Sequence, residues 1–201
     1  MSTFIAFAQL GFHHITDLAA LDHILFLLAL AAIYRGRDWR DTLWVITAFT
    51  VGHSVTLALA VTGALALPTG LIEFLIPVTI VATGLENLAV RDRSRAPFGG
   101  RYRPAFAGIF GLVHGAGFAN YLESLFEGAI AMPLFGFNVG IELGQIAVLG
   151  SAALALGGVD RLLGLLRAPG RIPSAHRVRV VGVSAAVVLV AARMAVERVP
   201  W

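Results

Sequence analysis

The sequence predicts an all-α membrane protein, a bundle of about six transmembrane helices in a single domain over 1–201. Three observations support this fold class. Hydrophobic residues make up 58% of the chain and charged residues only 13%, about half the charged share of a soluble domain. Six apolar stretches are long enough to cross a bilayer, which takes about 20 residues each. Basic residues are concentrated in alternate connections between these stretches.

The six predicted spans follow one another with short connections. They cover 15–34, 42–67, 70–90, 104–122, 131–156 and 178–195. Glycine and proline are frequent across 157–179, which therefore predicts the longest loop. This loop would separate a core of spans over 15–156 from a peripheral last span at 178–195.

The arginines predict the orientation of the chain. All 15 basic residues are arginine, and three lie in 35–41, five in 91–103 and five in 157–179. The connections on the other side, around Pro68 and across 123–127, contain none. Short basic loops favour the cytoplasmic side. We therefore expect a multi-pass protein of the inner (cytoplasmic) membrane with both termini outside, and no nucleic-acid partner.

Ionisable residues inside the spans are the main functional signal, because each costs about 3 kcal/mol or more at mid-membrane. Five of the six histidines lie in or beside predicted spans. The chain has no cysteine, so a metal ion would be held by imidazole, carboxylate or amide groups. The candidate metal ligands are His14, Asp17, Asp22, His23, His53, His114 and Glu142.

Several of these candidates lie at one depth in the membrane. His53, His114 and Glu142 each stand ten or eleven residues from the end of a span, or about 15 Å at the helical rise of about 1.5 Å per residue. Asp22 and His23 fall near the same level. Three helices, and a fourth if the first span contributes, would then present nitrogen and oxygen ligands to one midplane metal site.

The first span requires an irregularity if all its polar residues serve one route. His14 and His23 are nine positions apart and would lie on opposite faces of a continuous helix. We therefore expect a bend, or a separate outer segment, near 16–20. His14 would then pair with Asp17 on the outer side, and Asp22 with His23 further in.

Other polar residues are predicted to line the route. Asn138, Glu142 and Gln145 form one helical stripe, and Ser54 is adjacent to His53. Glu86 and Asn87, about a turn from the cytoplasmic end, would line the exit. Interhelical hydrogen bonding is an equally good explanation for Asn87, Asn138 and Gln145. Glycines recur every fourth residue at 136, 140 and 144, and at 111 and 115, which predicts close helix packing.

Four stretches together resemble the HupE/UreJ family of small bacterial membrane proteins, which are regarded as nickel permeases. They are GFHHITDLAALDHILFLLAL at 11–30, TAFTVGHSVTLAL at 47–59, FGLVHGAGFAN at 110–120 and FNVGIELGQ at 137–145. The resemblance implies a multi-span fold in which histidine and acidic residues of the first span recognise metal. By position, His14, Asp22 and His23 match the His…Asp-His element of the family, and His114 with Gly115 matches its later His-Gly element.

The sequence also departs from the nickel permeases. Seven residues separate His14 from Asp22, where those proteins have five. Their later motif adds a histidine and a glutamate, and Gly117 stands here instead. The resemblance therefore implies a divergent branch with a divalent-metal role.

Two functions use the same cluster. The favoured one is membrane transport or binding of a divalent transition-metal ion, nickel-like but with Ni²⁺, Zn²⁺, Co²⁺ and Fe²⁺ all open. The alternative is an intramembrane zinc-dependent hydrolase in which His23, His53, His114 and Glu142 supply the metal ligands and a carboxylate base, with an open position for water. Ser54 beside His53 is an optional nucleophile. The sequence has no HExxH or GxSxG motif to support the hydrolase. A non-catalytic partner subunit ranks last, and the oligomeric state, a homo-oligomer included, stays open.

Overall fold

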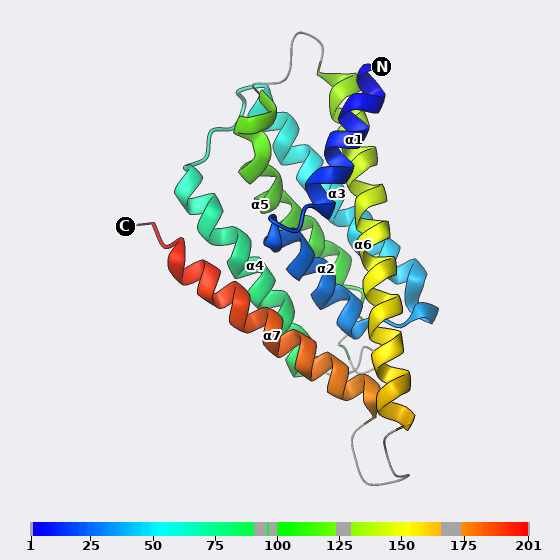
Figure 1. Cartoon of the computed structure of the whole chain (residues 1–201). Coiled ribbons are helices and arrows are strands. Elements are labelled where there is room, and N and C mark those ends of the chain that lie inside the picture. The colour runs from blue at the N-terminus through cyan, green and yellow to red at the C-terminus, as the bar shows by residue number, and fades with distance from the viewer. Residues whose placement is uncertain (1, 91–95, 97–99, 124–129, 166–173, 201) are drawn as a thin grey trace.

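The computed structural model describes the chain except at residues 1, 91–95, 97–99, 124–129, 166–173 and 201, and omits the side chains of 119–123 and 163. Its described part is helical throughout, which confirms the all-α bundle (Figure 1). The elements are α1 (Thr3–Thr16), α2 (Leu21–Ile33), the 3-10 turn η1 (Gly36–Asp38), α3 (Trp39–Val61), α4 (Thr69–Val90), α5 (Arg103–Glu123), α6 (Ala131–Leu165) and α7 (Ala175–Glu197).

Four described helical segments are long and apolar enough to cross a membrane: Gly36–Val61, Thr69–Val90, Ala131–Leu162 and Ala175–Glu197. The helices α1 and α2 meet at a bend of 71° and together are long and apolar enough to make a fifth crossing if the pair is one broken span. Figure 1 shows α2 continuing from the end of α1 towards the opposite end of the bundle. The fourth predicted stretch, 104–122, corresponds to α5, which packs along α3.

Two predicted boundaries were wrong. The first span, 15–34, is not one helix, because α1 already begins at Thr3 and the chain breaks after Thr16. The loop expected at 157–179 is also shorter, since α6 continues to Leu165 and α7 begins at Ala175. Each glycine at 157 and 158 costs a helix only about 1 kcal/mol. The leucine-rich run that follows them is a good helix former, so this pair does not end α6.

The glycine stripes join helices into two tight pairs, as predicted. In the first pair, a Cβ at Gly140 of α6 would overlap the Ala8 carbonyl oxygen of α1. In the second, a Cβ at Gly111 of α5 would overlap the Phe49 carbonyl oxygen of α3. Backbones in such contact leave no room for a larger residue. The pairs α1–α6 and α3–α5 are therefore held at fixed spacing.

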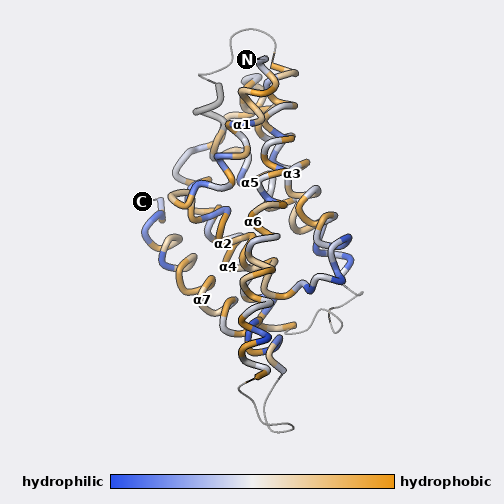
Figure 2. Tube along the Cα trace, turned by 45° about the vertical axis from the view of Figure 1, so that its right-hand side comes forward, coloured by the Kyte–Doolittle hydropathy of each residue, from blue (hydrophilic) through white to orange (hydrophobic). Residues whose placement is uncertain are grey.

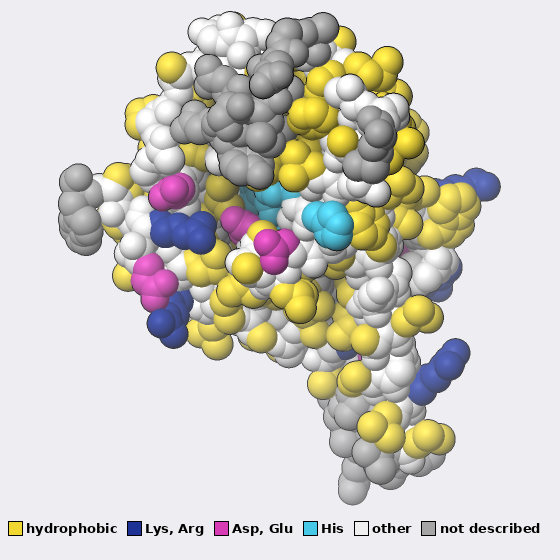
Figure 3. Space-filling view, turned by 45° about the horizontal axis from the view of Figure 1, so that its top comes forward, with side chains coloured by type: hydrophobic (Ala, Val, Ile, Leu, Met, Phe, Trp, Pro, Cys, Tyr) yellow, Lys and Arg dark blue, Asp and Glu magenta, His cyan; other side chains and the backbone are white. Residues whose placement is uncertain are grey.

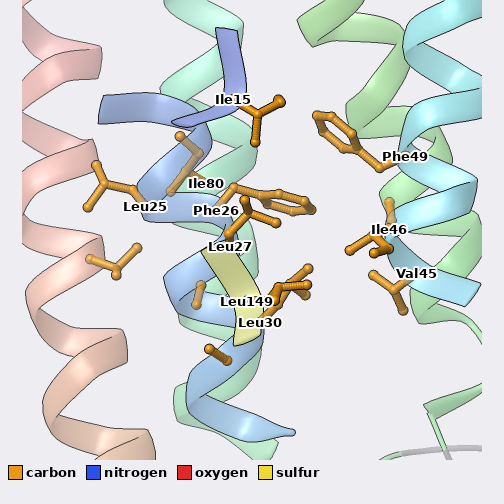
Figure 4. Packing of buried hydrophobic residues seen from close by; sticks show 14 of the residues in the cluster. Ile15, Leu25, Phe26, Leu27, Leu30, Val45, Ile46, Phe49, Ile80 and Leu149 are labelled. Atoms are coloured by element: carbon orange, nitrogen blue, oxygen red, sulfur yellow. The ribbon is translucent and has the colours of Figure 1, made fainter. Parts of the chain in front are cut away.

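The short helix α2 forms the centre of the bundle. Nine of its thirteen residues are buried. Figure 4 shows Phe26 and Leu30 of α2 directed towards the side chains of α3, and the Phe26 and Phe49 rings stack with centroids 4.9 Å apart. The apolar core continues from Ile15 on α1 to Ile80 on α4. The core thus surrounds the point where the first crossing is interrupted.

Polar residues are concentrated at one end of the bundle. The start of α3, the end of α6 and the start of α7 meet at that end, where Figure 2 shows hydrophilic residues on α3 and α6. The N-terminus lies at the opposite end, and α7 runs away from the arginine-rich end (Figure 1). The described arginines of the three basic connections therefore share one side of the molecule, as the sequence predicts.

Candidate metal centre

The break between α1 and α2 creates the centre of the candidate site. Asp17 ends α1 in an extended conformation, and its Oδ1 accepts a hydrogen bond of 2.9 Å from the Ala19 amide. No side chain caps the start of α2. The bend brings His14, near the end of α1, to His23, near the start of α2, with ring centroids 4.6 Å apart. The predicted irregularity in the first span is confirmed.

A third imidazole completes a group that could hold a metal ion. His53 of α3 contributes it, and one ligand nitrogen from each of His14, His23 and His53 lies within 4.8 Å of the others. His53 is fully buried, and neither of its ring nitrogens has a hydrogen-bond partner in the described structure. Nε2 of His14 and Nε2 of His23 lack partners there too. Unpaired buried polar atoms cost about 1–3 kcal/mol each, and nitrogens in this state are free to coordinate a ligand.

Two further predicted ligands border this group. The His114 ring of α5 lies 5.4 Å from the His23 ring, and its Nε2 is 3.1 Å from Thr79 Oγ1 of α4. Asp22 Oδ1 lies 3.1 Å from His23 Nδ1. Contacts of this kind fix the orientation of a metal-binding imidazole. Five helices, α1 to α5, thus contribute to one polar cluster in the core.

Phenylalanine rings enclose the histidines. Phe118 lies 3.9 Å from the His14 ring, and Phe137 lies 6.3 Å from the His53 ring. Phe49 packs 5.1 Å from His114. Sequence reasoning missed these residues and Thr79, since a phenylalanine or threonine in an apolar span carries no signal of its own. Only the packing of the helices identifies them.

The polar stripe of α6 is placed differently from the prediction. Glu142 accepts a 2.5 Å hydrogen bond from Thr47 Oγ1, and Gln145 accepts one of 3.1 Å from Thr50 Oγ1. The close group of ligand atoms in the described structure does not include Glu142. Asn138 Oδ1 is buried without a partner. Glu142 and Gln145 therefore link α6 to α3 through interhelical hydrogen bonds.

In the described structure, Ser54 is not paired with His53 as an activated nucleophile would be. Its Oγ donates a 2.6 Å hydrogen bond to the Thr50 carbonyl in the preceding turn. The neighbouring His53 makes no hydrogen bond to it. A serine nucleophile needs contact with a base, and that contact is not present here.

An open hollow leads from the surface to the histidines. It has a volume of about 380 Å³. The residues that line it are Leu10, His13, His14, Thr16, Asp17 and Phe118. His13 and Asp17 are exposed, and Figure 3 shows histidine and acidic side chains near one another on this face of the molecule. We call this hollow the outer vestibule.

The predicted exit residues lie in a network at the arginine-rich end. The Glu86 carboxylate accepts hydrogen bonds from the Tyr102 hydroxyl and the Arg103 guanidinium. Asn87 Nδ2 donates to the Ala29 carbonyl at 2.8 Å. Arg103, which the sequence identified only as a topology marker, is therefore a buried partner of Glu86.

Comparison with known proteins places the chain in a family. A family model described as HupE / UreJ protein matches residues 1–198. The match extends the resemblance beyond 11–145 to include α7. Neither a curated protein nor a solved structure matches the chain. With its long apolar helices, the chain is a multi-pass membrane protein that belongs to the HupE/UreJ family.

Proposed function

We propose that this protein carries a divalent transition-metal ion across the bilayer and binds it at His14, His23 and His53. The observation that supports this proposal is the meeting of three imidazoles from α1, α2 and α3, with ligand nitrogens within 4.8 Å, inside an apolar core. Membership of the HupE/UreJ family is consistent with metal transport.

The donor set suits a borderline metal ion. Imidazole binds Ni²⁺, Zn²⁺, Co²⁺ and Fe²⁺, whereas Mg²⁺ and Ca²⁺ prefer oxygen ligands. A metal–nitrogen bond of about 2.0–2.1 Å places two ligand nitrogens roughly 3–3.5 Å apart. The spread of up to 4.8 Å therefore requires the imidazoles to close by about 1 Å. The break between α1 and α2 supplies a place where such closure costs few backbone hydrogen bonds.

The broken crossing favours transport over a resident metal. Transporters commonly bind their substrates where a membrane helix is interrupted, because the freed backbone and helix ends can then face the ion. The end of α1 at Thr16 carries the negative end of its helix dipole, which favours a cation. The outer vestibule gives His14 direct access from the end that holds the N-terminus.

The arginine-rich end is assigned to the cytoplasm, because short basic connections favour that side. Ions would enter through the outer vestibule past Asp17 and reach the three histidines. His114 and Asp22 would support the site, and Glu86 and Asn87 would lie on the way out. The direction is therefore import, with nickel as one of four candidate ions.

Binding and uptake by the full chain test this proposal. Protein in lipid nanodiscs would be titrated with Ni²⁺, Zn²⁺, Co²⁺ and Fe²⁺, and proteoliposomes would be assayed for uptake of the ion that binds best. His23→Ala and His53→Ala should each lower affinity by about a hundredfold, since loss of one ligand removes roughly 3 kcal/mol. His176→Ala, at the start of α7, is the matched control. Uptake by both site variants at the parental rate would refute the proposal.

A further inference from the structure

A buried ion pair lies on the arginine-rich side of the histidine site. Arg103, the first residue of α5, is only 6% exposed. Its guanidinium contacts the Glu86 carboxylate, which also accepts a hydrogen bond from the Tyr102 hydroxyl. Nη2 of Arg103 also donates to Asn87 Oδ1 at 3.2 Å. The positive charge of Arg103 and the negative charge of Glu86 are therefore paired with each other where α4 meets α5.

Cavities lie on either side of this pair. On the side of the site, a cavity of about 100 Å³ extends from Phe26 to Glu86 and Arg103. The Phe26 ring lies 6.2 Å from that of His114, so this cavity begins at the edge of the histidine cluster. On the other side, a hollow of about 240 Å³ is lined by residues that include Tyr34 and Asp41. We call these the inner cavity and the inner vestibule.

The Arg103 side chain stands between Glu86, in the wall of the inner cavity, and Tyr34, in the wall of the inner vestibule. It lines the inner cavity, and its guanidinium carbon lies 5.6 Å from the centroid of the Tyr34 ring, which lines the inner vestibule. A divalent cation leaving the site would therefore meet a fixed positive charge. It could pass only if the guanidinium moved away from Glu86.

We propose that Arg103, held by Glu86 and Tyr102, is the cytoplasmic gate of the metal route and is closed in this structure. This inference rests on the proposed transport function. The outer vestibule reaches His14, so the site is open outward in this structure. Opening requires Glu86 to exchange the guanidinium for the passing cation. A carboxylate is a suitable partner for either cation, so Glu86 stays paired throughout the exchange.

The gate is connected to the site through two helices. Thr79, Thr83 and Glu86 stand at i, i+4 and i+7 on one face of α4, and reach from His114 through the inner cavity to the ion pair. Asn87 also joins Arg103 to the Ala29 carbonyl of α2, the helix that begins beside His23. Closure of the imidazoles on a metal ion would move α2. That movement reaches Arg103 through Asn87.

Cysteine accessibility tests the gate directly, because the natural chain contains no cysteine. Thr83→Cys places a thiol in the wall of the inner cavity. A membrane-impermeant maleimide would be applied to inverted membrane vesicles, which expose the cytoplasmic side. With the gate intact, labelling should be slow. Adding Glu86→Gln, which removes the charge that holds Arg103, should raise the labelling rate roughly tenfold or more.

The controls separate opening from damage. Glu197→Gln breaks the exposed pair with Arg193 and should leave labelling of Thr83→Cys unchanged. Thr16→Cys in the outer vestibule should react from the outer side equally in parent and Glu86→Gln backgrounds, provided the variant folds. If Glu86→Gln does not fold, Tyr102→Phe decides, since it keeps the ion pair and removes only one hydrogen bond. It should give a smaller rise.

The result is independent of transport, because labelling needs no metal ion. Fast labelling of Thr83→Cys in the parental background would overturn the gate. So would an unchanged rate in folded Glu86→Gln or Tyr102→Phe protein. Faster labelling in a protein that binds and transports none of the four ions would support the gate as a structural barrier and refute the proposed function.

Discussion

Adding one methyl group at Gly115 should damage the metal site without changing any ligand. An ideal Cβ at Gly115 of α5 lies 2.9 Å from both the Cα and the carbonyl carbon of His53. Carbon atoms in favourable contact are about 3.5–4.0 Å apart. The obstacle is backbone, so rotamer changes cannot relieve it. Gly115→Ala must therefore separate α3 from α5 at His53 by about 0.6–1 Å.

This displacement should affect both stability and binding. Overpacking of a tight interface costs about 1–3 kcal/mol. Moving His53 outward widens a ligand group that must instead close by about 1 Å to bind metal. We expect Gly115→Ala to bind Ni²⁺ at least roughly tenfold more weakly, because 1.4 kcal/mol of misplaced ligation suffices for that factor. Titration in nanodiscs and the midpoint of thermal unfolding would measure the two effects.

Gly108→Ala is the matched control, because it adds the same methyl group to the same seam between α5 and α3. Its Cβ would lie 3.5 Å from the Ala48 carbonyl oxygen, an ordinary contact. It should bind metal like the parent and melt within a few degrees of it. If Gly115→Ala behaves in the same way, the histidine group does not depend on the spacing of this helix pair, and our reasoning about the site is refuted.

Three further predictions follow from other contacts. Thr79→Val removes the partner of His114 Nε2 and should weaken metal binding about threefold to tenfold. The control is Thr56→Val, because the Thr56 hydroxyl bonds only to its own helix, and its metal titration should match that of the parent. Arg179→Gln breaks the contacts that join α7 to Asp160 and to the end of α2, and should cost about 3 kcal/mol or more in the free energy of unfolding. Arg193→Gln, which breaks only an exposed pair, should leave the free energy of unfolding close to that of the parent, and equal losses in the two variants would contradict this prediction. Glu142→Gln should keep the link to Thr47 and bind metal like the parent, so a lost titration signal would return Glu142 to the ligand set.

The sequence was sufficient for the fold class and for the break in the first crossing. In a continuous helix, His14 and His23 would lie on opposite faces. Both can reach one site only if the helix bends between them, and the structure contains this bend. His53 and His114, which the depth estimate places at one level, both lie near His23 in the structure. These inferences succeeded because polar atoms in an apolar span are costly and must meet partners.

The depth of a residue in the membrane does not reveal how its helix is rotated about its own axis, and for α6 the sequence reasoning was insufficient for this reason. Glu142 has the depth that a ligand needs, yet it contacts Thr47 outside the close group of ligand nitrogens. The azimuth of α6 is fixed by its glycine stripe against α1, because Gly140 meets the Ala8 carbonyl. Because the glycine face of α6 packs against α1, the Glu142 side chain points towards α3. The rotation follows from backbone contact, which the position of polar residues in the sequence does not reveal.

Arg103 shows a different limit of sequence reasoning. Thirteen of the 15 arginines fall in the three basic connections, and one explanation, orientation, accounts for all of them equally. What distinguishes Arg103 is that Glu86 lies near the arginine-rich end of the helix preceding this connection, and Arg103 begins the helix that follows it. Two antiparallel helices joined at this end place both residues at one level, where each charge lowers the cost of burying the other. A carboxylate near the end of one span and an arginine at the start of the next should therefore be examined as a pair before either is assigned to topology.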